Sequence, residues 1–145
     1  MKKLAAIDPG VSGGVAVMRG TEIVAMPLPQ SPNELHALLE DCDEVAIEDV
    51  PCFCGKAVPS HTAFKLGKSC GAVEAIANLS GAVVHRWKPQ QWQKALGIRK
   101  AKGETQQQWK ARLRDEATNL TALPATLKTA DALLLLHLLL SRDRD

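Results

Sequence analysis

A long hydrophobic run is absent from the 145-residue sequence. The longest uncharged apolar stretch, Ala132 to Leu140, is too short to span a bilayer, because a membrane-spanning helix needs about 20 apolar residues. The Lys2-Lys3 start leads at once into a strand-like run that ends in an acid, which is not the pattern of a secretory signal. We therefore expect a cytosolic protein with no membrane partner.

Cysteine is also scarce. The four cysteines, Cys42, Cys52, Cys54 and Cys70, have a spacing that fits no standard zinc pattern. We interpret them as reduced thiols, as is usual in the cytosol. An alternative is a metal site formed by Cys52 and Cys54 with a partner such as His61.

Internal repeats and low-complexity segments are missing too, and 145 residues fit one domain. Hydrophobic residues make up 46% of the chain, which is enough for a core. We expect a single domain at residues 1–141, followed by a frayed tail at residues 142–145.

The net charge is only +2, but the charges are unevenly distributed. Nine of the 18 basic residues lie between Arg86 and Arg114, where Glu104 is the single acid; this leaves nine bases and 15 of the 16 acids elsewhere. A basic segment on an otherwise acidic chain predicts a phosphate-facing surface. The alternative is a helical face that is merely solvated.

Hydrophobic patterning predicts five strands and five helices. The first three strands are separated by short turns, which indicates an antiparallel meander. A helix separates the third and fourth strands, and a right-handed crossover would set the fourth strand parallel to the first. The expected strands are 4–8, 14–18, 22–26, 45–47 and 82–85, and the expected helices are 32–40, 61–79, 90–96, 105–119 and 127–141.

Capping residues mark the ends of two predicted helices, 32–40 and 61–79. Ser31, Pro32 and Glu34 combine a capping serine, a proline at the first helical position and an acid three residues after the cap. Ser60 is expected to cap the helix 61–79, and Gly81 is expected to close it.

Three acids stand where predicted elements end or begin. Asp8 ends the first strand, Glu48 follows the fourth strand, and Asp131 opens the apolar last helix. If the first and fourth strands are parallel neighbours, the first two carboxylates emerge about 5 Å apart. Carboxylates so close together repel unless a cation intervenes, and carboxylate oxygens suit Mg²⁺ or Mn²⁺. Beside a basic surface, this cluster predicts metal-dependent phosphodiester chemistry.

Each acid alone also has a structural explanation. Asp8 precedes Pro9 and is a common type of turn residue. Glu48 can pair with a lysine, and Asp131 can stabilise the start of its helix. The metal-site hypothesis depends on all three acids meeting.

Each of the three acids stands in a longer motif: IDPGVSGG contains Asp8, VAIEDVP contains Glu48, and KTADALLLLHLL contains Asp131. These motifs resemble those of the RuvC-type Holliday junction resolvases, which have the RNase H fold. Between them, AFKLGKSCGAVEAI and RWKPQQWQKALG resemble the family's intervening segments. The resemblance covers roughly residues 4–139 and includes the β-β-β-α-β-α-β-α order of elements.

The resemblance implies an α/β, RNase H-like fold with a central mixed five-stranded sheet flanked by helices. It further implies a homodimeric endonuclease that cuts four-way DNA junctions by paired nicks. The enzyme would depend on Mg²⁺, which Mn²⁺ can replace. Asp8, Glu48 and Asp131 match three of the family's catalytic, metal-binding acids. The small residues of the helix 61–79 make it our candidate dimer face.

One position departs from the family pattern. The family usually has an acid or histidine three residues before the last acid, and here that position is Lys128. Lysine cannot coordinate Mg²⁺, so three interpretations are open: a loosely held second metal, a positive charge supplied by Lys128 near the scissile phosphate, or reduced activity. His137, further along the helix, is interpreted as a core residue.

The resemblance also indicates DNA contacts. Phe53 lies in the region where the family inserts an aromatic side chain at the junction centre, and stacking on an unpaired base contributes about 1–3 kcal/mol; the alternative is a core position. Trp87, Trp92 and Trp109 are interpreted as core residues rather than stacking partners. The predicted phosphate contacts are Lys56, Lys65, Lys68, Arg86, Lys88, Lys94, Arg99, Lys100 and Lys102.

Other functions remain open from the sequence. The same acids suit another nuclease of this fold that acts on RNA–DNA hybrids or branched forks, and Lys128 suits a protein that binds junctions without cutting them. A sugar kinase or actin-like ATPase needs a second similar domain, for which 145 residues leave no room. We therefore expect no nucleotide cofactor.

Overall fold

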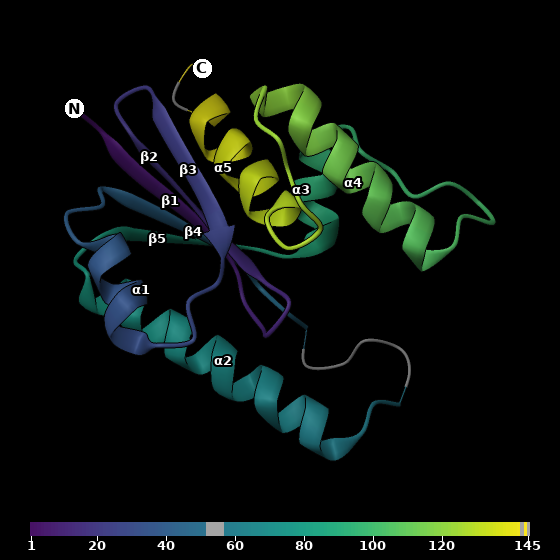
Figure 1. Ribbon diagram of the computed structural model, residues 1–145, viewed down its shortest axis with the longest axis horizontal. Helices are drawn as coiled ribbons and strands as arrows, with labels where there is room; N and C mark the ends of the chain where they lie inside the picture. Colours follow the sequence, from purple (N-terminus) through teal and green to yellow (C-terminus); the bar gives the residue numbers. More distant parts are fainter. Residues whose placement is uncertain (52–56, 143, 145) are drawn as a thin grey trace.

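The centre of the computed structural model, which describes residues 1–51, 57–142 and 144, is a five-stranded sheet flanked by helices (Figure 1). This is the α/β architecture that the sequence predicted. The strands are β1 (Lys3–Asp8), β2 (Gly14–Arg19), β3 (Glu22–Pro27), β4 (Glu44–Glu48) and β5 (Val83–Trp87). The helices are α1 (Pro32–Leu39), α2 (Ser60–Leu79), α3 (Pro89–Ala95), α4 (Gln106–Thr121) and α5 (Ala130–Arg142).

The strand order across the sheet is β3-β2-β1-β4-β5. The first three strands form the predicted antiparallel meander, and β4 pairs parallel with β1 and with β5. Ile7 pairs with Ile47, so the next residues, Asp8 and Glu48, end neighbouring parallel strands at the same edge of the sheet. The crossover argument from the sequence is thereby confirmed.

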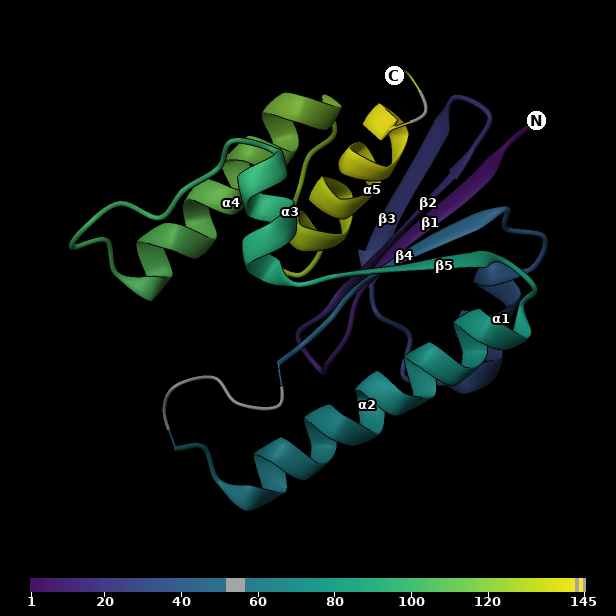
Figure 2. The ribbon, with the colours of Figure 1, turned by 180° about the vertical axis from the view of Figure 1, so that it is seen from behind.

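Two separate cores lie on the two faces of the sheet. Alternate residues of β1 point in opposite directions, and the four central ones, residues 4–7, are fully buried. Leu4 and Ala6 pack against α5 and its neighbours, and Ala5 and Ile7 pack on the side of α1 and α2. Figures 1 and 2 show α3, α4 and α5 on one face and α1 and α2 on the other.

Helix α5 is the centre of the larger core, as its apolar sequence predicted. Leu133 to Leu136 are at most 1% exposed, since α5 lies between the sheet and α4. The helix begins at Ala130 rather than at residue 127, because Thr126 and Thr129 hydrogen-bond each other's backbone N–H groups in a turn before it. It includes Arg142, which the sequence placed in the tail; residues 143 and 145 lie outside the described part of the chain.

Most element ends differ from the prediction by one to three residues, and three details of capping and pairing differ as well. Ser60 is the first residue of α2, and Pro59 occupies the capping position. Ser31 caps α1 by position only, because its side chain makes no capping hydrogen bond. Strand β5 continues to Trp87, which pairs with Glu48 in the ladder and stacks on His85 at a centroid distance of 5.7 Å. The predicted left-handed closure at Gly81 is confirmed, with φ of 82°.

The remaining sequence expectations concern membranes and cysteines. Within the described ranges, none of the helices has both the length and the apolar character needed to cross a membrane. Cys42 and Cys70 are free thiols. The alternative metal site at Cys52 and Cys54 falls outside the described residues.

Candidate metal centre

Asp8, Glu48 and Asp131 come together at one end of the sheet, although 40 and 83 residues separate them in sequence. One carboxylate oxygen from each residue lies within 4.8 Å of the others. Parallel pairing of β1 and β4 places the first two, and Asp131 enters from the first turn of α5, which packs on both strands. The meeting of the three acids, which the hypothesis required, is confirmed.

Two glycines allow this close assembly. A Cβ atom on Gly13 would lie 1.9 Å from the backbone oxygen of Asp8, and one on Gly14 would lie 2.2 Å from the backbone oxygen of Lys128. Gly14 therefore lets the segment that leads into α5 approach β2 and bring Asp131 to the strand ends. The turn itself is tied to α2, because the Gly10 N–H donates to Ser69 Oγ over 3.1 Å.

Burial favours the protonated form of all three acids, and repulsion from neighbouring carboxylates adds to this effect for Asp8 and Glu48. Burial, then the charges of Glu48 and Asp131, raises the pKa of Asp8 well above its usual value. Burial, then Asp131, raises the pKa of Glu48 to about 7, and burial raises that of Asp131 to about 6. Such shifts mark a cluster of acids that lacks sufficient positive charge.

A second interaction orients Glu48. The indole N–H of Trp92, at the buried side of α3, donates to Glu48 Oε2 over 2.9 Å. This hydrogen bond favours the charged carboxylate and partly opposes the rise in its pKa. Trp92 is fully buried, so the core interpretation is confirmed, and the same residue also serves the acidic cluster.

The donor set fits a divalent cation. Three carboxylates offer hard oxygen ligands from three rigid elements, within reach of one ion. A cation among them would stabilise the charged carboxylates, which burial and, for Asp8 and Glu48, repulsion disfavour. Asp8, Glu48 and Asp131 are therefore the residues that would hold a metal.

The acids lie in a cleft of about 940 Å³. One wall comes from the first turns of α2, with His61, Thr62 and Lys65, and the other from α3, α4 and the segment before α5. Lys65, Lys110 and Lys128 bring positive charge to the lining. Two of these lysines were predicted from the sequence, and Lys110 was not singled out.

The other predicted DNA contacts occupy different environments. Arg86 forms an ion pair of 2.8 Å with Glu74, so part of its charge is already balanced. Phe53 and Lys56 lie outside the described residues. Six further residues are exposed and do not line the cleft: Lys68, Lys88, Lys94, Arg99, Lys100 and Lys102.

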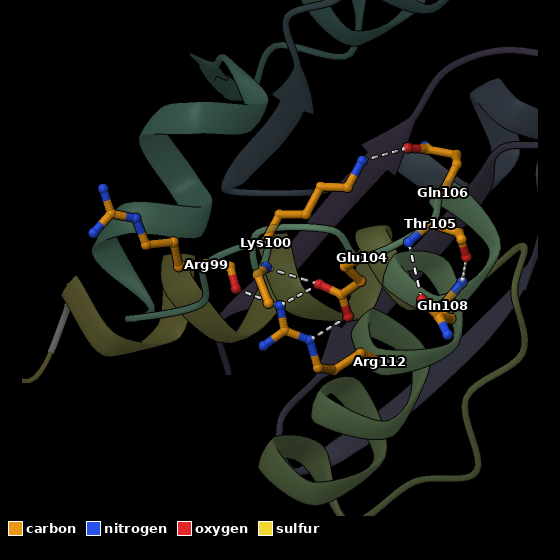
Figure 3. A network of polar contacts seen from close by, with 8 residues as sticks. Arg99, Lys100, Glu104, Thr105, Gln106, Gln108 and Arg112 are labelled. Carbon is orange, nitrogen blue, oxygen red and sulfur yellow. Dashed lines mark hydrogen bonds and ion pairs between the residues drawn. The ribbon is translucent and has the colours of Figure 1, made fainter.

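The loop between α3 and α4 carries Arg99, Lys100 and Lys102 and is held by hydrogen bonds. Glu104 accepts hydrogen bonds from the Ala101 N–H over 2.9 Å and from Arg112 Nε over 3.0 Å. Arg112 also donates to the backbone oxygen of Arg99, whose side chain points away from this network (Figure 3). Lys100 Nζ reaches Gln106 Oε1 at 3.3 Å. The Glu104–Arg112 pair therefore gives the basic loop a defined shape.

Sequence reasoning missed the contributions of α3 and α4 to the cleft. Gln90, Gln93, Gln106 and Lys110 line it. The buried stripe of Trp109, Leu113 and Ala117 on α4 was recognised, and Gln106 and Lys110 border that stripe one turn apart. That spacing was the available signal, but it could not tell whether this border faces the acids or the solvent.

Comparisons with known proteins agree with this architecture. No family model and no curated protein matches the sequence. Two solved structures of RuvC from Thermus thermophilus, one of them in complex with a Holliday junction, match with a TM-score of 0.61. They share 21% and 22% identity with this chain; the alignments cover 99% and 98% of it and 96% and 95% of the respective RuvC chains. This chain therefore has the RNase H-like fold of RuvC that the sequence resemblance implied.

Proposed function

We propose that the protein is a metal-dependent endonuclease that resolves four-way DNA junctions by paired cuts. The observation that carries this proposal is the triad of Asp8, Glu48 and Asp131 in an open cleft with lysines on its walls. The full-length likeness to RuvC, one structure of which holds junction DNA, supports a branched DNA as the substrate.

The triad is suited to Mg²⁺, with Mn²⁺ as a substitute. When bound, such an ion would supply an activated water and charge stabilisation for phosphodiester hydrolysis. Trp92 keeps Glu48 oriented, and the glycine turn keeps Asp8 and Asp131 together. Lys65 on α2 would bind a DNA phosphate at the opposite wall of the cleft.

A homodimer is part of the proposal, with α2 as its interface. Phe64 on this helix is 70% exposed, and a Cβ atom on Gly67 or Gly71 would meet nothing within 4 Å. A second copy could therefore approach this face closely. A dimer would present two acidic triads to a junction, which is what paired cutting needs.

The test is cleavage of a labelled four-way junction and a matched linear duplex in Mg²⁺, Mn²⁺ or EDTA, beside an Asp8→Asn variant. We expect paired, metal-dependent cuts in the junction alone, and their loss in the variant. The variant should still bind the junction, because it removes a metal ligand and not a phosphate contact.

Two other outcomes would redirect the proposal. Tight junction binding without cleavage in either metal would favour the non-catalytic alternative, for which Lys128 in the cleft is the supporting observation. Cleavage of an RNA–DNA hybrid in preference to the junction would leave the metal centre in place and assign it a different substrate.

A further inference from the structure

Helix α4 presents one side of its first two turns to the acidic cleft. Gln106, Lys110 and Leu113 line the cleft, and their spacing of four and then three residues places them on one helical face. Trp109, 6% exposed and beside Lys110, anchors this part of the helix in the core next to α5. Lys110 therefore extends from a rigid element and not from a mobile loop.

Lys110 lines the same cleft as the three acids. Lys110 is itself exposed, so its ammonium group is accessible from the cleft. In agreement with this placement, its charge lowers the pKa of both Asp8 and Asp131, in opposition to the larger effect of burial. A phosphate bound in the cleft beside the acids would therefore meet this cation.

Charge counting indicates what this lysine changes. Three ionised carboxylates carry a charge of −3, and each lysine of the cleft lining offsets part of that charge before a metal ion enters. A divalent cation then enters a site whose negative charge is already reduced, and like charges at short range repel. The site with Lys110 therefore demands less divalent metal than the carboxylates alone would.

We propose that Lys110 is a catalytic residue, which binds the substrate phosphate at the acidic triad and provides positive charge that would otherwise come from a metal ion. This inference rests on the proposed nuclease function. It assigns to Lys110, on α4, the role of cation at the scissile phosphate that the sequence suggested for Lys128.

The test compares Lys110→Met, Lys110→Arg and, as a matched control, Arg114→Met. Arg114 is on the same helix one turn further along, lies outside the cleft lining and is 3.4 Å from Asp115. Mn²⁺ affinity is measured by calorimetry without DNA in about 0.15 M salt, where exposed charges further than about 8 Å away are screened. Single-turnover cleavage and junction affinity are measured in parallel.

We expect Lys110→Met to bind Mn²⁺ about tenfold more tightly, because the repulsion from the ammonium is gone. The same variant should cleave the bound junction about 10- to 100-fold more slowly, since a group that stabilises charge in the transition state is lost. Lys110→Arg should stay near the unsubstituted protein in both measurements. Arg114→Met should change Mn²⁺ affinity less than twofold.

Equal Mn²⁺ affinity in Lys110→Met and Arg114→Met would overturn the inference and leave the proposed function intact. Unchanged cleavage by Lys110→Met would likewise remove the catalytic role. If the unsubstituted protein binds no Mn²⁺ at all, the proposed function and this inference fail together.

Discussion

At the scale of single residues, Glu48 destabilises the metal-free protein at neutral pH. Its pKa of about 7 lies above the ordinary glutamate value of 4.5, so the folded state retains a proton that the unfolded chain releases. The folded state binds more protons over this window, and stability therefore falls as pH rises from about 4.5 to 7. We expect Glu48→Gln to raise the unfolding free energy at pH 8 by about 1–3 kcal/mol, with no gain at pH 4.

Thermal unfolding in EDTA across this pH range checks the prediction. Glu74→Gln is the control, because Glu74 is ion-paired with Arg86 rather than placed among acids. Saturating Mg²⁺ should reverse the order of stability, since only the intact triad gains binding energy. A pH profile shared by Glu48→Gln and the unsubstituted protein would contradict the prediction.

The hydrogen bond from Trp92 to Glu48 leads to a second residue-scale prediction. Trp92→Phe keeps most of the buried ring and removes the donor, so Glu48 loses the group that orients it. We expect Mn²⁺ affinity to fall about tenfold, as for other losses of a partner that orients a metal ligand. Trp87→Phe, at a half-buried ring outside the cleft lining, is the calorimetric control and should leave affinity unchanged. An equal fall in both variants would mean that packing, and not the hydrogen bond, is responsible.

The three acids could be found in the sequence, whereas their cationic neighbour could not. Asp8 and Glu48 end apolar runs, and strand ends meet at a sheet edge wherever the strands are parallel. Asp131 stands at the start of a helix too apolar to lie anywhere but the core. Lys110 has no such signature, because its position depends on how α4 is rotated against α5.

At the scale of elements, the basic loop before α4 depends on Glu104. This carboxylate holds both the Ala101 N–H and the Arg112 side chain, and Arg112 also binds the backbone of Arg99 (Figure 3). Glu104→Gln removes a negative charge, which by itself would favour DNA binding. We nevertheless expect junction affinity to fall about three- to tenfold, because ordering the loop on binding then costs conformational entropy.

Asp115→Asn separates these two effects. It removes the same charge from a side chain that is 67% exposed on α4 and that pairs with Arg114. We expect it to tighten junction binding slightly, so the two variants should shift affinity in opposite directions. Fluorescence anisotropy at fixed salt measures both, and a gain of affinity in Glu104→Gln would refute the role of the loop.

Some elements follow from sequence patterns within their own segment, whereas others depend on contacts between segments that are distant in sequence. The meander, the buried α5 and the stripe on α4 follow from patterns within each segment. The extension of β5 to Trp87 does not, since it depends on pairing with β4 and on stacking against His85. The hydrogen bond from Arg112 to Glu104 likewise joins residues eight positions apart across the start of α4, where no periodic pattern exists.

At the scale of the whole molecule, the order of elements was sufficient to predict the meander and the parallel β1–β4 pair, because few connections satisfy the crossover rule. The place of β5 beside β4 was not predicted. The cleft was harder, since its walls come from α2, α3, α4 and the segment before α5. Nothing in the sequence specifies the spacing between these walls, which the packing of the two helical layers determines. The proposed dimer was harder still to predict, because it depends on the exposed face of α2.

That surface leads to the last prediction, which concerns paired cutting. Phe64→Glu places a charge on the exposed face of α2, and a buried charge without a partner is strongly disfavoured at an interface. We expect the variant to sediment as a monomer of 15.6 kDa and the unsubstituted protein to sediment as the proposed dimer. On a plasmid with an extruded cruciform, the dimer should yield linear product by two cuts. The monomer should leave mainly nicked circles, because each triad then acts alone.

Val24→Glu, at an exposed position on the edge strand β3, is the control and should remain dimeric. Linear product at an unchanged rate from a monomeric Phe64→Glu variant would show that α2 does not couple the two cuts.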